Sequence, residues 1–316
     1  NNENNVNNNE NNENNESNSN NYENNKLISI AGRIMVRRFF GKLAFFELKD
    51  HTGTIQLYID KGRLKNEFTN IQNWSDNGDI IGVTGTMKRT EKGELSVYVS
   101  TWTMLTKSLL PLPDKFHGLT DIDTRYRNRH LDMIVNDEVI LTLKKRALII
   151  QTIRSYLDDL KYIEVETPVL ITHAGGADAE PFLTYHNSLD MKLSLRIATE
   201  LHLKRLIVGG IPRVYEIGRI FRNEGLSTRH NPEFTSIELY ESYADYNTMM
   251  LRTEDIISNS IQKLCAIYPK DPLLGNLKDD VYHIKYQDYD IDMTPPYKRI
   301  SMHDCVFEYT GINFDD

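Results

Sequence analysis

This sequence of 316 residues has few cysteines and no long apolar run, and basic residues are lacking near its start. It holds no apolar stretch of about 18 residues, which excludes a membrane-spanning helix and predicts no membrane partner. No basic start is followed by an apolar run and a cleavage site, so no secretory signal is indicated. The two cysteines, Cys265 and Cys305, stand 305 − 265 = 40 positions apart and predict free thiols of a reducing compartment, without a zinc site.

The net charge of −8 is spread unevenly along the chain. Residues 1–25 hold 16 Asn, five Glu and no Lys or Arg, and so few apolar groups predict a disordered segment. Residues 26–115 hold 14 Lys and Arg and 9 Asp and Glu, or 14 − 9 = +5, which leaves −8 + 5 − 5 = −8 for the rest. RNA binding by residues 26–115 and binding of a cationic small molecule by the remainder would fit this split. Random charge drift between domains would fit it as well.

Five short β-type runs follow, at 28–38, 43–49, 54–59, 79–87 and 95–105, separated by turn residues. Between the third and the fourth, segment 61–74 repeats its apolar residues at helical spacing. This order predicts an OB-fold over 26–110, a small all-β barrel whose open face binds oligonucleotides. An SH3-like barrel is the main alternative, but it would not usually hold that helix.

The remainder predicts an α+β domain over 124–316, after a proline-containing linker at 111–123. Asn136 is expected to cap a long helix, with Asp137 and Glu138 in its first turn. Further helices are expected at 200–208, ending at Gly209-Gly210, and at 246–265. The expected strands lie at 162–167, 182–186, 192–197, 213–223 and 234–243.

The strongest chemical signal is Phe221-Arg222-Asn223-Glu224, followed by a polar loop and His230-Asn231-Pro232-Glu233-Phe234. On a strand, Arg222 and Glu224 would share one face, and a guanidinium there suits a phosphate and a carboxylate together. His230 adds a donor, and Phe234 offers a ring on which a purine could stack. Taken alone, an Arg-x-Glu pair is more often a surface ion pair of little consequence.

The full string resembles motif 2 of the class II aminoacyl-tRNA synthetases. The string 161–168, Lys-Tyr-Ile-Glu-Val-Glu-Thr-Pro, resembles their motif 1, which ends at Pro168 and implies a homodimer. A barrel ahead of such a domain is the layout of the aspartate, asparagine and lysine subclass. Within it, the strings at 198–206, 229–234, 243–246 and 111–119 are similar to lysyl-tRNA synthetases.

The acidic groups around the expected pocket favour lysine independently of these strings. Lysine carries two ammonium groups and one carboxylate, so a selective site needs two acids and one cation. Glu200, Glu238 and Arg222 supply them, and Glu238 and Tyr240 would share one face of a strand. The resemblance implies lysine binding by these groups, with Gly176 beside them, whereas an aspartate enzyme would need extra cations.

The resemblance also implies ATP as a substrate with Mg²⁺, and tRNA(Lys) and L-lysine as partners. Its ATP site would be formed by Arg222, Glu224, His230, Asn231 and Phe234, with Arg222 as the catalytic residue. Its anticodon site would be formed by Arg37, Phe45, Gln56 and Glu94 on the open face of the barrel, although Phe45 could instead belong to the barrel core. The Arg-His-Asn-Pro form of the motif 2 loop is similar to bacterial or organellar members rather than to the eukaryotic cytosolic form, so the expected location is cytoplasmic or organellar, with a lean towards organellar.

One part of the family pattern, the glycine-rich motif 3, has no counterpart in the 316 residues. We therefore expect a fragment that lacks full activity, with the magnesium ligands of the family beyond Asp316. Three alternatives stay open: an aspartyl- or asparaginyl-tRNA synthetase, a non-catalytic RNA-binding protein derived from a synthetase, and a relative that transfers lysine to a protein. The barrel argues against the last one.

Overall fold

In the computed structural model, residues 26–113, 119–274 and 281–313 are described. The Asn-rich segment expected to be disordered lies outside these ranges, as does most of the string at 111–119. The chain forms two compact units, residues 1–137 and 138–316, so the division falls later than the linker expected at 111–123. No described helix is long and apolar enough to cross a membrane.

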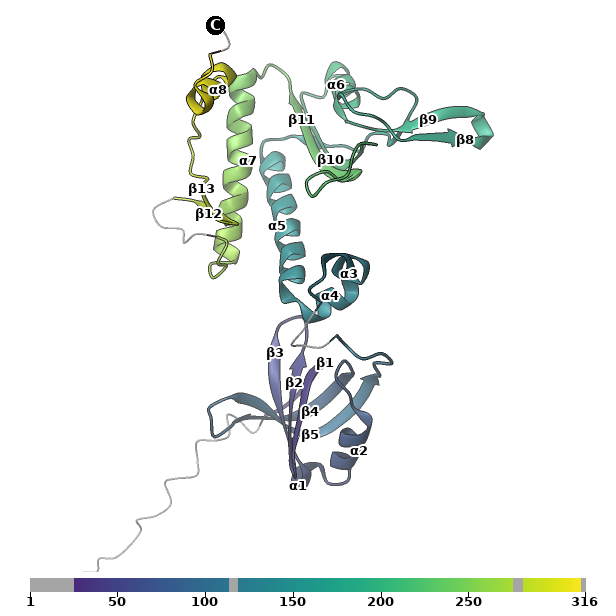
Figure 1. The fold of residues 1–316 in the computed structure, drawn as a ribbon, viewed down its shortest axis with the longest axis vertical. Helices are drawn as coiled ribbons and strands as arrows, with labels where there is room; N and C mark the ends of the chain where they lie inside the picture. The colour runs from purple at the N-terminus through teal and green to yellow at the C-terminus, as the bar shows by residue number, and fades with distance from the viewer. Residues whose placement is uncertain (1–25, 114–118, 275–280, 314–316) are drawn as a thin grey trace, which may run out of the picture. The chain divides into compact units, whose positions relative to one another are not determined.

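The first unit is a closed five-stranded barrel, and the strand predictions for it are confirmed. Its strands are β1 (Leu27–Phe40), β2 (Leu43–Lys49), β3 (Thr54–Asp60), β4 (Ile80–Arg89) and β5 (Leu95–Thr106), paired in the order β1-β2-β3-β5-β4 (Figure 1). The single helix expected at 61–74 is instead two, α1 (Lys61–Leu64) and α2 (Glu67–Trp74). They are separated at Lys65, whose φ of 52° is incompatible with a continuing helix.

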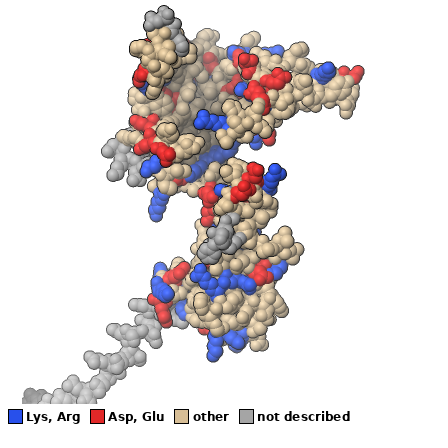
Figure 2. All heavy atoms as spheres, viewed as in Figure 1, with Lys and Arg blue, Asp and Glu red and all other residues tan. Residues whose placement is uncertain are grey.

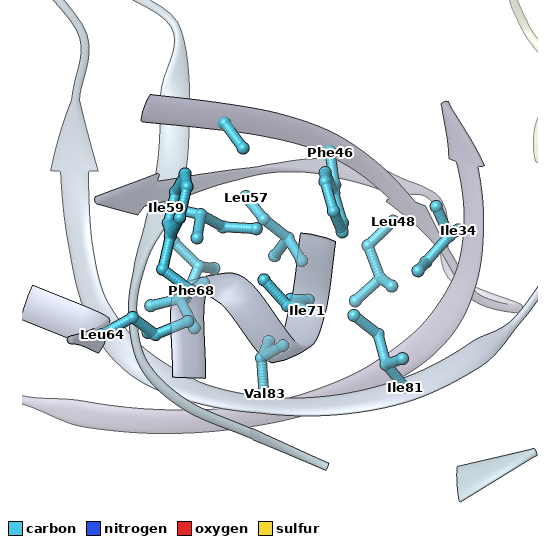
Figure 3. Packing of buried hydrophobic residues seen from close by; sticks show 13 residues of the cluster. Ile34, Phe46, Leu48, Leu57, Ile59, Leu64, Phe68, Ile71, Ile81 and Val83 are labelled. Carbon is cyan, nitrogen blue, oxygen red and sulfur yellow. The ribbon is translucent and has the colours of Figure 1, made fainter. Parts of the chain in front are cut away.

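One hydrophobic cluster fills the barrel. Its strands alternate buried and part-exposed residues, and the inward side chains meet those of α2 (Figure 3). Phe46, Leu57 and Ile71 are at most 1% exposed. Because α2 inserts Phe68 and Ile71 into this cluster, the helix closes one end of the barrel.

After the barrel come two short helices, α3 (Ile122–Arg127) and α4 (Arg129–Val135), where a linker was expected. They are held by the buried carboxylate of Asp132, which accepts hydrogen bonds from Arg125, Arg129 and the Asn136 amide. An ion pair between Lys49 of β2 and Asp137 ties their far end to the barrel. These contacts explain why the compact unit extends to residue 137.

The second unit contains a sheet with strand order β11-β10-β6, backed by two long helices. Its strands are β6 (Ile163–Glu164), β10 (Arg213–Phe221) and β11 (Glu233–Glu241), and its helices are α5 (Asp137–Asp159) and α7 (Tyr246–Ile267). A second sheet has the order β7-β9-β8, with β7 (Leu170–Ile171), β8 (Leu183–His186), the 3₁₀ turn η1 (Asn187–Leu189) and β9 (Met191–Leu195). Helix α6 (Glu200–Val208), the hairpin β12 (His283–Tyr286) with β13 (Tyr289–Asp292), and α8 (Met302–Thr310) complete the unit (Figure 1).

The β10–β11 pair has one apolar and one polar face. Tyr215, Ile217, Ile237 and Leu239 pack with side chains of α5 and α7 around Leu157. Opposite residues of an antiparallel pair share a face, so the other face carries Glu216 beside Glu238, Gly218 beside Ser236 and Ile220 beside Phe234. The α+β prediction is confirmed, and the polar face carries the predicted site residues Phe234, Glu238 and, two positions further along β11, Tyr240.

Candidate functional site

Arg222 and Phe234 meet at one end of this polar face. Arg222 directly follows β10, and its backbone N–H donates to the Pro232 carbonyl at 2.9 Å. The guanidinium carbon lies 5.3 Å from the centre of the Phe234 ring, a cation–π contact. Its Nε is buried and has no hydrogen-bond partner among the described residues. A buried donor without a partner is costly, so this end of the face suits an anionic acceptor.

The remaining motif 2 residues lie in the exposed loop between β10 and β11. Because β10 ends at Phe221, the expectation that Arg222 and Glu224 share the face of a strand was wrong. Glu224, His230 and Asn231 are all exposed. Ser227 and His230 form a small bridge, closed by a 2.7 Å contact between Ser227 Oγ and His230 Nδ1. The loop is thus partly ordered by itself, while its charged groups face outward.

Two carboxylates and a tyrosine gather at the other end of the face. Glu238 Oε1 accepts from the Thr199 N–H at 3.1 Å, and its Oε2 accepts from the Tyr240 hydroxyl at 3.3 Å. Burial, followed by the negative charges of Glu238 and Glu200, raises the pKa of Tyr240, so the phenol keeps its proton near neutral pH. The expectation that Glu238 and Tyr240 share a face is confirmed.

Glu200 and Gly176 border this carboxylate cluster. Gly176 has φ of 86°, and a Cβ there would lie 3.0 Å from the Glu200 Cβ and 3.2 Å from the Ala198 Cβ. Only glycine therefore fits between the loop and the start of α6 without strain. Glu200 forms a 2.6 Å ion pair with Lys204, whose ammonium lies 5.5 Å from the centre of the Tyr240 ring. The signal for Lys204 in the sequence was its spacing of four from Glu200 on a helix.

A buried ion pair, not foreseen from the sequence, supports the floor of the site. Arg196 and Glu216 are each 3% exposed and paired with each other. Arg196 also donates to the Thr167 and Arg219 carbonyls at 3.0 and 2.9 Å, while Glu216 accepts from the Thr167 hydroxyl at 2.6 Å. A Cβ at Gly218 would lie 2.3 Å from the guanidinium, so glycine makes room for it. The pair links β10 to the segments on either side, and it satisfies Arg196 without using Glu238.

The described residues do not fit a magnesium ion. No group of three or more His, Cys, Asp or Glu side chains in the described ranges is placed to hold a metal. Glu224, the carboxylate nearest in sequence to Arg222, is exposed.

On the barrel, three of the four predicted anticodon residues come together. Phe45, Gln56 and Glu94 line one cavity of about 560 Å³ on the outer face of the strands. The core position that had been an alternative for Phe45 is taken by Phe46. Figure 2 shows Lys and Arg side chains on the viewed face of the barrel, with acidic side chains among them.

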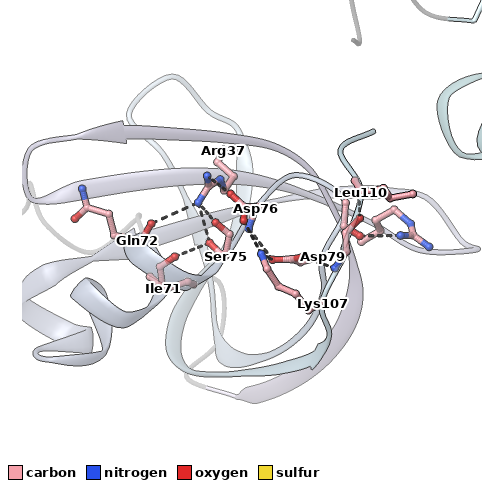
Figure 4. A network of polar contacts seen from close by, with 11 residues as sticks. Arg37, Ile71, Gln72, Ser75, Asp76, Asp79, Lys107 and Leu110 are labelled. Atoms are coloured by element: carbon pink, nitrogen blue, oxygen red, sulfur yellow. Dashed lines mark hydrogen bonds and ion pairs between the residues drawn. The ribbon is translucent and has the colours of Figure 1, made fainter. Parts of the chain in front are cut away.

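Arg37, the fourth predicted residue, lies elsewhere. It donates to the carbonyl of Ser75 and pairs with Asp76 at 2.8 Å, in a network that continues to Lys107 and Asp79 (Figure 4). Its neighbour Arg38 lines the cavity instead. The reason is the two-residue period of a strand: Arg37 is opposite the core residue Phe46, and Arg38 is opposite Phe45.

Comparison with known proteins agrees with both parts of this geometry. The family model described as tRNA synthetases class II (D, K and N) matches residues 121–316, well over half of the chain. This chain belongs to that family. A second model, an OB-fold nucleic acid binding domain, matches residues 28–105.

The similar curated relatives of this class II tRNA synthetase chain are named lysine--tRNA ligase. The protein of Nostoc sp. (strain PCC 7120 / SAG 25.82 / UTEX 2576) is 59% identical over 295 residues, which cover 91% of this chain and 50% of that protein. That of Nostoc punctiforme is 58% identical, with the same shares covered. The protein of Thermosynechococcus vestitus is 59% identical, and the match covers 91% of this chain and 55% of that protein. The chain thus spans about half the length of the curated relatives that it matches.

Pro168, where motif 1 is expected to end, is the next residue after a partner of the buried Arg196–Glu216 pair. It is exposed, between β6 and β7, directly after the Thr167 that both charged residues hold. The segment expected to be motif 1 is therefore held, through Thr167, to Glu216 of β10, the strand that leads into the segment expected to be motif 2.

Proposed function

We propose that the protein is a lysine--tRNA ligase, which activates lysine with ATP and transfers it to tRNA(Lys). The observation that carries this is the charge order along one face of β11. Arg222 and Phe234 lie at one end, and Glu238, Tyr240 and Glu200 lie at the other. Glu238 is four positions after Phe234 on this strand, or about 13 Å away at the usual rise.

This arrangement complements free lysine. The guanidinium of Arg222 suits the carboxylate of the amino acid and the α-phosphate of ATP together, because it can donate in two directions. Glu200 and Glu238 suit the two ammonium groups, and the protonated Tyr240 fixes the orientation of Glu238. Aspartate carries a second carboxylate in its side chain and would place that negative charge against these acids, at a cost of several kcal/mol.

In the first reaction step, the lysine carboxylate attacks the α-phosphorus of ATP and pyrophosphate leaves. Both reactants are anions, so the barrier comes largely from their repulsion and from orientation. Arg222 between the two groups reduces both contributions, and no side-chain nucleophile or general base is needed. Phe234 offers a ring face to the adenine. A hydroxyl of the terminal ribose of the tRNA then attacks the carbonyl carbon of the lysyl-adenylate, which forms the lysyl ester and releases AMP.

The barrel is proposed as the anticodon-binding part. Arg38, Phe45, Gln56 and Glu94 line one cavity, which combines a cation, a stacking ring and polar groups able to contact base edges. The resemblance of the motifs also supports two further proposals. The protein forms a homodimer through the motif 1 region around Pro168, and it is located in an organelle. Imaging of a fluorescent fusion checks the location.

The deciding experiment is amino-acid-dependent ATP–pyrophosphate exchange by the protein at the full length of its relatives. We expect exchange with lysine, and neither aspartate nor asparagine should support it. Glu238→Gln should lower kcat/KM for lysine by about 30-fold or more, because an ammonium loses its buried partner. Arg219→Ala is the matched control, because this exposed arginine of β10 lies on the opposite face of the sheet.

Exchange with aspartate or asparagine in place of lysine would reject the lysine assignment. The chain of 316 residues by itself is expected to give little exchange, because it holds no string resembling motif 3. Exchange by this chain at the rate of the longer protein would contradict that expectation.

A further inference from the structure

The outer face of the barrel carries its cavity residues in cross-strand rows. In one row, Arg38 is paired with Phe45, and Phe45 with Tyr58 of β3. In the next row towards the hairpin turn, Phe40 is paired with Leu43. Since side chains two positions apart share a face, Phe40 stands beside Arg38 on the same surface as Phe45.

Phe40 is an aromatic side chain that nothing in the barrel core requires. It is 62% exposed and lines the same cavity as Phe45. Trp74, the other strongly exposed aromatic residue of the described barrel, is 61% exposed and lies on α2, away from that cavity. A single exposed aromatic needs no explanation, but one that shares a charged cavity with a stacking residue points to a ligand.

The other two rings of the outer face are already covered. The ammonium of Lys88 lies 4.1 Å from the centre of the Tyr58 ring and 5.0 Å from that of Tyr98. The guanidinium of Arg63 lies 4.1 Å from the Tyr98 ring as well. These cation–π contacts occupy the ring faces that a base would use, which leaves Phe40 and Phe45 as the stacking surfaces of the cavity.

The Phe40 and Phe45 rings are placed to take two different bases. Their centres are 6.0 Å apart and their planes are inclined by 67°. A base parallel to the Phe45 ring cannot also be parallel to the Phe40 ring. The cavity of about 560 Å³ lies within the range of roughly 300–1,000 Å³ typical of pockets for drug-sized ligands. Arg38, Lys88, Arg89 and Lys92 supply its basic lining, which suits a phosphate backbone.

We propose that Phe40 is a second stacking platform, so that the barrel holds two neighbouring unpaired bases of an RNA strand, one on Phe45 and the next on Phe40. This inference rests on the proposed RNA-binding role of the barrel and extends it by one nucleotide position. Stacking on an aromatic ring tolerates every base, so Phe40 contributes to affinity and to strand direction more than to base identity.

The test is fluorescence anisotropy of the complete 316-residue chain with 5′-labelled oligouridines of two and four nucleotides. Phe45→Ala should weaken the binding of both. Phe40→Ala and Phe40→Leu should weaken both the dinucleotide, whose two bases fill the two platforms, and the tetranucleotide by about fivefold or more. Phe40→Tyr keeps the ring and should bind as the unchanged chain does, and Trp74→Ala is the control for an exposed aromatic outside the cavity.

The outcomes separate the inference from the function on which it rests. If Phe45→Ala weakens binding while Phe40→Ala and Phe40→Leu bind the tetranucleotide normally, the second platform is refuted and the RNA-binding role stands. If Phe40→Leu binds normally but Phe40→Ala does not, Phe40 supports the hairpin and takes no base. If the unchanged chain binds neither oligouridine, the RNA-binding role and the second platform are both rejected.

Discussion

The barrel and the synthetase domain are stabilised in different ways. In the barrel, one continuous cluster buries side chains from β1–β5, α1 and α2. In the second unit, two separate clusters are each built around three buried residues. This unit also leaves large apolar side chains open, among them Phe307 and Tyr309, the latter 80% exposed.

Buried charge accounts for much of what holds the second unit together. Arg196 pairs with Glu216, while Glu241 accepts from Tyr162, Arg213 and Arg252. Burial raises the pKa of Glu241, but the hydrogen bonds from Tyr162 and Arg252 outweigh it, so the pKa lies below its usual range. Hydrophobic burial is non-directional, whereas such pairs fix particular atoms relative to one another.

The two units can be observed separately in one denaturation experiment. Both tryptophans of the chain, Trp74 and Trp102, lie in the barrel, so tryptophan fluorescence reports only the barrel. The long helices α5 and α7 lie in the second unit and dominate the helical circular dichroism. The predictions below use these two signals.

The largest effect is expected from Arg196→Met. It leaves the buried Glu216 without its charged partner and should lower the free energy of unfolding of the second unit by about 3–5 kcal/mol. The circular dichroism transition should shift and the tryptophan transition should not. Arg196→Met with Glu216→Met should recover most of the loss, because no buried charge is left alone. A double variant as unstable as the single one would show that the charge itself is not the cause.

The next effect is expected in the barrel, from Ile71→Ala. This fully buried side chain of α2 closes the barrel, and its truncation should lower the free energy of unfolding by about 2–5 kcal/mol. Only the tryptophan transition should move. The matched variant Ile71→Val removes a single methylene and should cost about 0.5–1.5 kcal/mol. A shift of both transitions would mean that the units do not unfold independently.

A pH-dependent effect is expected at Asp79, whose side chain is fully buried. Burial raises its pKa, but hydrogen bonds from Lys107 and from the N–H groups of Ser108 and Asp76 outweigh this, so the pKa lies below its usual value. A lowered folded pKa stabilises the protein above the unfolded pKa of about 3.9, and the stabilisation is lost as pH falls through the folded pKa.

Asp79→Asn should therefore destabilise the barrel by about 2 kcal/mol at pH 7. The difference should shrink as the pH falls below about 4, and tryptophan-monitored urea curves across pH 2.5–7 check this. The exposed Glu91→Gln serves as the control. A difference between Asp79→Asn and the unchanged chain that is constant over this range would contradict the role of the ionised carboxylate.

The smallest effect is expected from Lys204→Met in the exposed pair with Glu200. The Lys204 side chain is 54% exposed, and a helical pair four residues apart usually contributes about 0.3–0.5 kcal/mol. Neither unfolding transition should move by more than that, in contrast to Arg196→Met. A loss of several kcal/mol would show that Lys204 has a structural role comparable to that of the buried arginine.

The accuracy of the predictions made from the sequence depended on the kind of structural element. The two-residue period predicted all five barrel strands, and the start of α5 was predicted within one residue because acidic residues mark it. The short helices α3, α4 and α8 and the hairpin β12–β13 were not foreseen, because short segments carry little periodic signal. The strand expected to continue to residue 223 stopped at Phe221, where the loop to Pro232 begins.

The site residues divide in the same way. As predicted, Arg222 lies beside Phe234, Glu238 beside Tyr240, and Gly176 beside Glu200, while the roles of these residues stay predictions. Arg196 and Glu216 were missed because their partnership spans separate strands, and each looks like an ordinary charged residue in its own segment. Arg37 was predicted from the family resemblance, but the pairing of β1 with β2 places Arg38 opposite Phe45, on the side of the cavity.

The sequence by itself determined the order of the two units, the strand and helix periods, and the residue types that a lysine and ATP site requires, because these depend on local spacing and side-chain chemistry. Only the tertiary structure decided which arginine faces the barrel cavity, that Phe40 lies beside Phe45, and with which buried acid Arg196 forms an ion pair. Those choices depend on strand register and on contacts between distant segments, and a shift of one residue moves a side chain to the opposite face.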